Sequence, residues 1–135
     1  MKNRLYLLVV AALLIGCETS PEKVKLRRYF VAGERLYADL CANCHQDQGQ
    51  GLLKMYPPIN RPISEEDVNK IACTIKLGAN DSITVNGIRY TLPMPDLHLS
   101  DLEIAEITTY ISNSWGNELG LIDVNTVRSL TRDCD

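Results

Sequence analysis

The 135-residue sequence is poor in the large side chains that usually fill a small core, since it has one Phe, one Trp and six Tyr. No apolar run reaches the roughly 18 residues of a transmembrane helix, so a spanning helix is not expected. The formal net charge of −3 shows no basic excess, and a nucleic-acid partner is therefore not expected. Hydrophobic residues at 45% and charged residues at 23% exclude wholesale disorder and indicate one small domain. Five cysteines are an odd number, so they cannot all pair within one chain.

The first seventeen residues have the pattern of a targeting segment. Lys2 and Arg4 precede an apolar stretch over residues 5–15, which is too short to cross a bilayer but typical of a signal peptide. The stretch ends in Leu14-Ile15-Gly16-Cys17, which resembles a bacterial lipoprotein signal. The resemblance implies that residues 1–16 are removed and that Cys17 carries lipid. A conventional cleaved signal followed by an unrelated cysteine is the alternative.

A lipoprotein signal directs export, so we expect the protein to lie in the cell envelope of a bacterium. There it would be anchored by lipid and would face the periplasm or the outside. Disulfides persist in such a compartment. Residues 17–28 are then expected to form the lipidated cysteine and a polar tether. Residues 29–117 are expected to form the globular domain, and residues 118–135 a tail that follows its surface.

The rest of the sequence predicts a mostly α-helical domain with three main helices and one small β-hairpin. Apolar residues recur at helical spacing from Tyr29 to Leu40. Two capping-box patterns, Ser64-Glu65-Glu66-Asp67 and Ser100-Asp101-Leu102-Glu103, each predict the start of a helix. Gly78 and Gly116 are expected to end these helices, and Asn86-Gly87 predicts the turn of the hairpin. The acidic residues at the helix starts are explained by capping, or alternatively by an acidic docking face for a basic partner.

The most informative string in the chain is Cys41-Ala42-Asn43-Cys44-His45. The C-x-x-C-H spacing indicates covalent attachment of a c-type haem. Two thiols at this spacing can reach both vinyl groups of one porphyrin, and the adjacent histidine can bind iron as the proximal ligand. A redox thiol pair and a zinc site are the alternatives. The helical pattern disfavours the first, and the lack of a second closely spaced ligand pair disfavours the second.

With this motif the sequence resembles the class I monohaem cytochromes c over roughly residues 29–116. The resemblance implies a cytochrome c fold around one covalently bound haem c. It further implies that the first helix crosses the last one, with Gly33 and Tyr37 on one side and Ile107 and Tyr110 on the other. After the stretch Gly49-Gln50-Gly51, the loop Pro57-Pro58-Ile59 would present a carbonyl to His45. Tyr56 and Pro58 are included among the haem-binding residues.

The same resemblance assigns the distal axial ligand to Met94, which precedes Pro95 shortly before the last helix. Ligation by His and Met raises the reduction potential and closes the sixth position, which suits electron transfer. His98 and Met55 are rival ligands. We expect His98 to lie at the surface or in a loop, and Met55 to serve in packing.

Cys73 and Cys134 lie outside the family pattern. In an oxidising compartment they could form a disulfide that links the tail to the second helix, and two free thiols are the alternative. The closed loop of about 60 residues would contribute roughly 4 kcal/mol in the chain-entropy model.

These features predict a membrane-tethered electron carrier rather than an enzyme. It would serve a respiratory or dehydrogenase complex as a separate carrier or small subunit, with an oxidase, reductase or dehydrogenase as redox partner. One alternative is a haem enzyme or gas sensor whose distal site is open or easily displaced, for which Arg61 and Arg89 are candidate distal groups. A weaker alternative is an interaction lipoprotein without haem.

Overall fold

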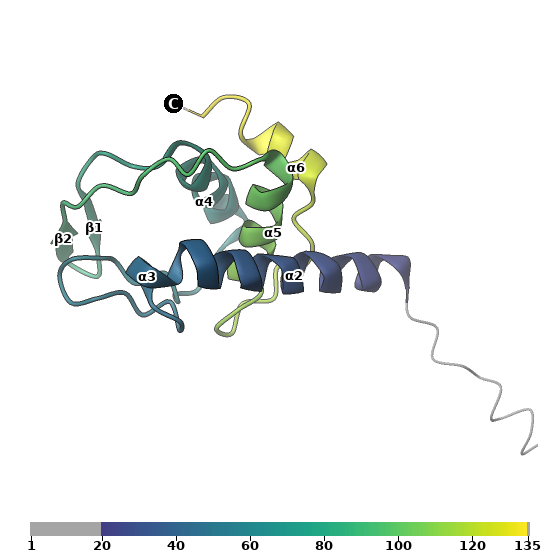
Figure 1. Ribbon diagram of the computed structural model, residues 1–135, viewed down its shortest axis with the longest axis horizontal. Coiled ribbons are helices and arrows are strands. Elements are labelled where there is room, and N and C mark those ends of the chain that lie inside the picture. Colours follow the sequence, from purple (N-terminus) through teal and green to yellow (C-terminus); the bar gives the residue numbers. More distant parts are fainter. Residues whose placement is uncertain (1–19, 135) are drawn as a thin grey trace, which may run out of the picture.

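The fold is mostly helical, as a computed structural model that describes residues 20–134 shows (Figure 1). Its elements are α2 (Pro21–Leu40), α3 (Ala42–His45), α4 (Glu65–Leu77), β1 (Ile83–Val85), β2 (Ile88–Tyr90), α5 (Asp101–Ile111) and α6 (Val124–Leu130). The predicted fold class is confirmed. The predicted signal peptide and Cys17 lie outside the described residues. Within residues 20–134, none of the helices combines the length and apolar character that a membrane crossing requires.

The centre of the fold is the crossing of α2 and α5, which pack against each other more extensively than any other pair of elements. A Cβ atom at Gly33 would overlap the carbonyl of Glu106, so the glycine lets the two backbones touch. Close to it the rings of Tyr37 and Tyr110 lie 5.2 Å apart between centroids. Ile107 is completely buried beside them. The predicted crossing is therefore made by the residues named for it.

The two predicted capping boxes are both formed. Ser64 accepts a hydrogen bond from the backbone of Asp67 at the start of α4, and Ser100 does the same for Glu103 at the start of α5. In turn, the carboxylates of Asp67 and Glu103 accept hydrogen bonds from the backbone N–H and the hydroxyl of the capping serine. Hydrogen bonds from Arg61 and then from Ser64 hold the pKa of Asp67 well below its usual range. Capping thus accounts for two of the acidic residues at the helix starts.

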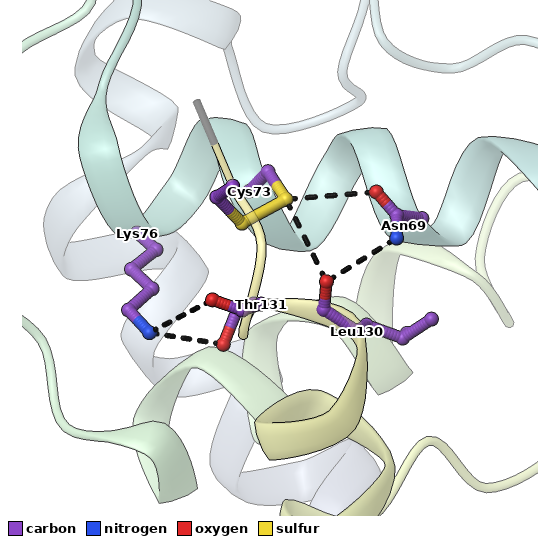
Figure 2. The surroundings of a disulfide bond; sticks show 6 residues. Asn69, Cys73, Lys76, Leu130 and Thr131 are labelled. Carbon is purple, nitrogen blue, oxygen red and sulfur yellow. Dashed lines mark hydrogen bonds between the residues drawn. A yellow bond between two sulfur atoms is a disulfide. The ribbon is translucent and has the colours of Figure 1, made fainter.

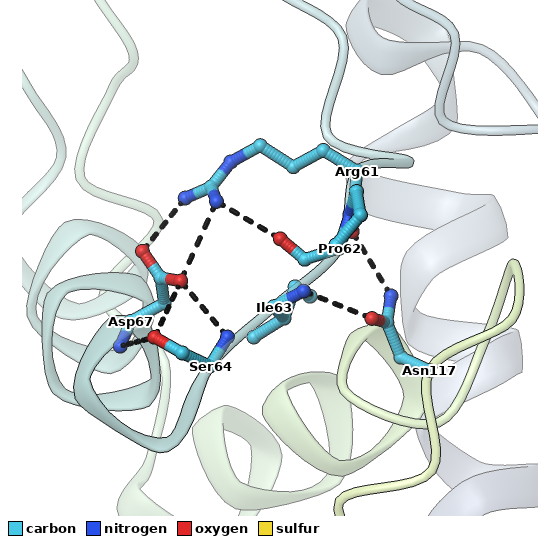
Figure 3. Close-up of polar contacts among 6 residues, drawn as sticks. All are labelled: Arg61, Pro62, Ile63, Ser64, Asp67 and Asn117. Carbon is cyan, nitrogen blue, oxygen red and sulfur yellow. Dashed lines mark hydrogen bonds and ion pairs between the residues drawn. The ribbon is translucent and has the colours of Figure 1, made fainter.

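A buried asparagine fixes the segment that leads into α4 (Figure 3). The side chain of Asn117 accepts a hydrogen bond from the backbone of Ile63 at 2.9 Å and donates one to the carbonyl of Arg61 at 3.1 Å. The Arg61 guanidinium in turn pairs with Asp67 at 2.9 Å. Arg61 and Asn117 therefore join the 61–63 segment both to α4 and to the turn after α5.

The predicted hairpin is confirmed, with Ile83 opposite Tyr90 and Val85 opposite Ile88. Its turn residues Asn86 and Gly87 both have positive φ, at 51° and 77°. This conformation matches the right-handed twist of the flanking strands, which explains the preference for Asn-Gly at two-residue turns.

The first helix begins at Pro21, eight residues ahead of the predicted start at Tyr29, so residues 21–28 of the predicted tether are helical. Ser20 caps the helix by accepting a hydrogen bond from the backbone of Lys23, and proline suits the first helical position. Lys25 pairs with Asp123 at 2.8 Å, which fixes these early turns to the C-terminal part of the chain.

The tail contains a helix, α6, that was not predicted. Asp123 caps it by accepting hydrogen bonds from the backbone of Asn125 and Thr126, and Val127 is completely buried against the core. A disulfide joins Cys73 on α4 to Cys134, with the Cα atoms 5.6 Å apart (Figure 2). Near it Asn69 donates to the carbonyl of Leu130, and Lys76 to the carbonyl and hydroxyl of Thr131. The tail is thus part of the packed domain.

Candidate cofactor site

The Cys41–His45 motif occupies the turn where α2 ends and the short helix α3 begins. The backbone N–H of Cys41 donates to the carbonyl of Tyr37, and those of Cys44 and His45 donate to the carbonyl of Cys41. The two cysteines are therefore held one helical turn apart on the same side of the backbone. Both are half-buried free thiols. One rigid turn thus positions both sulfurs and the histidine that follows them.

The chemistry of these thiols argues against a redox pair or a zinc site. Burial raises the pKa of the Cys41 thiol to about 11, followed by a smaller effect of Cys44. A redox-active cysteine needs a lowered pKa, because the thiolate is the nucleophile, so this thiol does not have the character of a redox pair. Among residues 20–134, no three His, Cys, Asp or Glu side chains lie together in a way that could hold a metal ion.

His45 is oriented by a backbone carbonyl. Its Nδ1 lies 3.0 Å from the carbonyl oxygen of Pro57, and because that oxygen can only accept, Nδ1 must carry the proton. The other ring nitrogen, Nε2, then has its lone pair available for a metal. Burial lowers the pKa of His45, which favours the neutral imidazole that ligation requires. The predicted proline loop therefore does supply the carbonyl, and the residue that carries it is Pro57, one position before Pro58.

The loop after the motif is held against it by close backbone contacts. The N–H of Gly51 donates to the carbonyl of His45 at 2.9 Å, and the Tyr37 hydroxyl donates to the carbonyl of Gln46 at 2.7 Å. Gly51 has a φ of 69°, and a Cβ atom there would overlap the carbonyl of Tyr56. The bond from Tyr37 was not predicted, because a tyrosine on the buried face of a helix is fully explained by packing. It ties α2 to the residue that follows the histidine.

Tyr56 lies next to Cys44 of the motif. The neighbouring Cys44 thiol raises the pKa of the tyrosine hydroxyl. Pro58 is half-buried in the same loop. The structure therefore brings Cys41, Cys44, His45, Tyr56 and the 57–58 segment together.

Met94 is supplied by a separate segment, which is fixed to the end of α4. Its backbone N–H and carbonyl pair with the carbonyl and N–H of Ala79, at 2.8 and 2.9 Å. A Cβ atom at the preceding Gly78 would overlap the Met94 carbonyl, so this glycine does more than end the helix. The Met94 side chain is half-buried against the hydrophobic core. This bridge between Ala79 and Met94 has no signal in the sequence, since it joins two irregular segments.

The rival ligands and the candidate distal groups are engaged elsewhere. The His98 side chain is 87% exposed and pairs with Asp96 at 3.1 Å, and Met55 lies at the surface. Arg61 pairs with Asp67, and Arg89 donates to the hydroxyl of Ser82.

The donor set present in the chain fits a covalently attached haem. It comprises two free thiols one turn apart, a neutral imidazole with a free Nε2, and a half-buried thioether on another segment. Thiols at this spacing next to a histidine are what c-type attachment requires. Cys73 and Cys134 take no part in the site, because their disulfide joins α4 to the tail.

Comparisons with known proteins point to the same chemistry. A family model described as cytochrome c matches residues 30–115. The chain is 30% identical over 104 residues to the cytochrome c subunit of the alcohol dehydrogenase (quinone) of Gluconobacter oxydans, covering 73% of this chain and 22% of that subunit. It is 31% identical over 91 residues to cytochrome c-552 of Thermus thermophilus, covering 63% of this chain and 69% of that protein. The chain thus spans about a fifth of the Gluconobacter subunit.

Proposed function

Because the chain belongs to the cytochrome c family and transfers electrons through one haem c, we propose that it is a membrane-tethered carrier with His45 and Met94 as axial ligands. The observation that carries the proximal half of this proposal is the contact between His45 Nδ1 and the Pro57 carbonyl. It leaves Nε2 free at a histidine that directly follows two free thiols.

The protein's own groups prepare the site for electron transfer. Cys41 and Cys44 would hold the haem through thioether bonds, and the bound haem supplies an iron that gains and loses one electron. The Pro57 carbonyl fixes the His45 tautomer and makes its Nε2 a stronger donor. The Met94 thioether is a soft ligand, which favours the reduced iron and raises the potential. If His45 and Met94 both bind the iron, the site would disfavour oxygen chemistry and would suit a carrier.

Two further parts of the proposal concern place and partner. The pattern ending in Cys17 supports a lipid anchor in a bacterial cell envelope, with the domain facing the periplasm or the outside. The similarity to cytochrome c subunits of quinone alcohol dehydrogenases supports a dehydrogenase as a redox partner. The chain would act as a separate carrier or small subunit that accepts electrons from such an enzyme.

The distal ligand is tested by the substitution Met94→Ala in the haem-loaded protein. We expect loss of the near-infrared absorption band that marks a bond between methionine sulfur and ferric iron, together with a lower reduction potential. Met55→Ala is the matched control and should keep both properties, because Met55 lies at the surface. If Met94→Ala keeps the band, the assignment of Met94 is wrong. Rapid binding of carbon monoxide by the reduced wild-type protein would favour the alternative in which the distal site is open.

Cofactor and anchor are tested together by the intact mass of the protein purified from a bacterial envelope. We expect the loss of residues 1–16, the addition of one haem and the addition of acyl chains at Cys17. A protein with haem but without lipid would contradict only the anchor. A protein with lipid but without haem would support the interaction-lipoprotein alternative instead.

A further inference from the structure

The outward face of α2 combines arginines with exposed valines. At about 100° per residue, this face lies opposite Gly33 and Tyr37, which pack toward α5. Val24 and Val31 are 37% and 38% exposed on it. Together with four basic residues they line a shallow surface groove: Lys23, Arg27, Arg28 and Arg35. The groove is amphipathic along the helix, with apolar residues at its middle and positive charge beside them.

The charge of this face is opposite to that of the rest of the chain. Residues 21–35 contain five Lys or Arg and two Asp or Glu, whereas residues 36–135 contain seven Lys or Arg and fourteen Asp or Glu. Lys25 pairs with Asp123. Among residues 20–134, the four basic side chains of the groove form no ion pair with a carboxylate, so their charge is available to an external anion.

We propose that this outward face of α2 lies on an anionic phospholipid surface. Arginine binds phosphate through two parallel hydrogen bonds, and helices with Arg or Lys beside apolar residues settle at the boundary between headgroups and acyl chains. The acidic remainder of the domain is repelled by the same surface, so one orientation is favoured.

A membrane is a better match than an acidic protein because of where α2 begins. This step rests on the proposed lipid anchor, since Cys17 precedes Pro21 by four residues. Four residues span at most about 15 Å, so a lipid on Cys17 would keep the first turns of α2 close to the bilayer. Figure 1 shows α2 running along the length of the domain. The tether would thereby bring the basic face within reach of the headgroups.

The orientation is tested by labelling arginines in the lipidated, haem-loaded protein on vesicles. On vesicles of phosphatidylglycerol and phosphatidylcholine, we expect Arg27, Arg28 and Arg35 to react several-fold more slowly with phenylglyoxal than on pure phosphatidylcholine. Arg132 is exposed outside α2 and serves as the internal control, with equal reactivity on both. Equal labelling of the three α2 arginines on the two kinds of vesicle would overturn the proposal.

A second measurement separates the basic face from the lipid anchor. Haem-loaded Cys17→Ser protein, exported from a conventional signal peptide, should co-sediment with the phosphatidylglycerol vesicles at low salt. About 1 M salt should release it, because the screening length falls to about 3 Å. The combined variant Arg27→Glu, Arg28→Glu and Arg35→Glu should lower the partition coefficient on the order of a hundredfold or more, as each basic residue near such a surface contributes about fivefold.

The matched control carries Lys54→Glu, Lys70→Glu and Arg132→Glu, which change the net charge equally at exposed positions outside α2. It should lower the partition several-fold at most. Equal losses in the two combined variants would mean that net charge alone matters, and would overturn the proposal. Failure of the Cys17→Ser protein to bind at all would also overturn it, and would leave an acidic protein surface as the alternative occupant. The intact mass decides separately whether the anchor exists.

Discussion

A single proton defines how His45 can act. This proton stays on Nδ1, which donates a hydrogen bond to the Pro57 carbonyl at 3.0 Å, and the free lone pair is thereby assigned to Nε2. The motif that contains His45 could be predicted in full, because its three chemical groups lie within five consecutive residues. The sequence indicated that the loop Pro57-Pro58-Ile59 supplies the accepting carbonyl, but it did not indicate which of the three residues carries it. The loop that carries this carbonyl passes close to Gly51, where a Cβ atom would overlap the carbonyl of Tyr56. This close approach joins residues five positions apart and is visible only in three dimensions.

Gly33 is the residue on which the helix crossing depends most directly. In an ordinary exposed helix, Gly→Ala stabilises the protein by up to about 1 kcal/mol. Here a new Cβ would overlap the Glu106 carbonyl, so α2 and α5 must separate. We expect Gly33→Ala to lower the free energy of unfolding by about 1–3 kcal/mol, the usual range for overpacking. Urea denaturation of the haem-loaded protein, followed by circular dichroism, would measure it.

The sign of this effect is the informative part. Ala38→Gly, on the exposed side of the same helix, is the control and should cost about 1 kcal/mol through helix propensity alone. An increase in stability for Gly33→Ala would show that the two backbones are not in contact in solution.

Among the elements, those with a strong local signal in the sequence could be predicted and those without one could not. The hairpin and the starts of α4 and α5 have strong local signals in Asn86-Gly87 and in the two capping boxes. The first turns of α2 are dominated by charged residues, so they lack the periodicity that marks the helix from Tyr29 onward. In α6, Val127 is the one fully buried residue of seven. So short a helix is unstable alone and depends on its Asp123 cap and on packing against α4 and α5.

The disulfide is the strongest constraint on this C-terminal element. Cys73→Ser combined with Cys134→Ser removes a cross-link between residues 61 positions apart. The chain-entropy model sets an upper value of roughly 4 kcal/mol for such a loop. We expect the free energy of unfolding to fall by about 2–4 kcal/mol, measured by urea denaturation of the haem-loaded protein.

A reductant provides the control for this pair of substitutions. With the haem iron kept reduced in every sample, it should destabilise the wild type by a similar amount and leave the double variant unchanged, because thioether bonds to haem are not reduced. Equal stability of the wild type and the double variant would show that the link does not constrain the unfolded chain.

For the molecule as a whole, the few aromatic residues are concentrated in one place and leave a small core. Phe30, Tyr37, Tyr110 and Trp115 form one cluster at the crossing of α2 and α5, with neighbouring ring centroids 5.2–5.8 Å apart. The rest of the core is built from aliphatic side chains on α4, α5 and α6. A core of this size makes a small domain marginal without further stabilisation.

Covalent haem should therefore be needed for folding. In Cys41→Ser combined with Cys44→Ser, which cannot form thioether bonds, we expect a large loss of helical circular dichroism and of cooperative unfolding in urea. Cys73→Ser combined with Cys134→Ser is the control, since it also removes two sulfur atoms but should retain haem and most of its helical signal. A cooperative transition with an unchanged midpoint in the haem-free variant would contradict this expectation.

The link between Cys73 and Cys134 also bears on how the other two cysteines must be kept apart from it during maturation. Chains are made from the N-terminus, so Cys41, Cys44 and Cys73 all emerge before the correct partner of Cys73 exists. During that interval three thiols compete in the same short chain, and any early bond between Cys73 and the motif would block the site. Attachment of haem to Cys41 and Cys44 removes two of the competitors. If haem attachment came first, Cys73 and Cys134 would be the two thiols left to pair among residues 20–134.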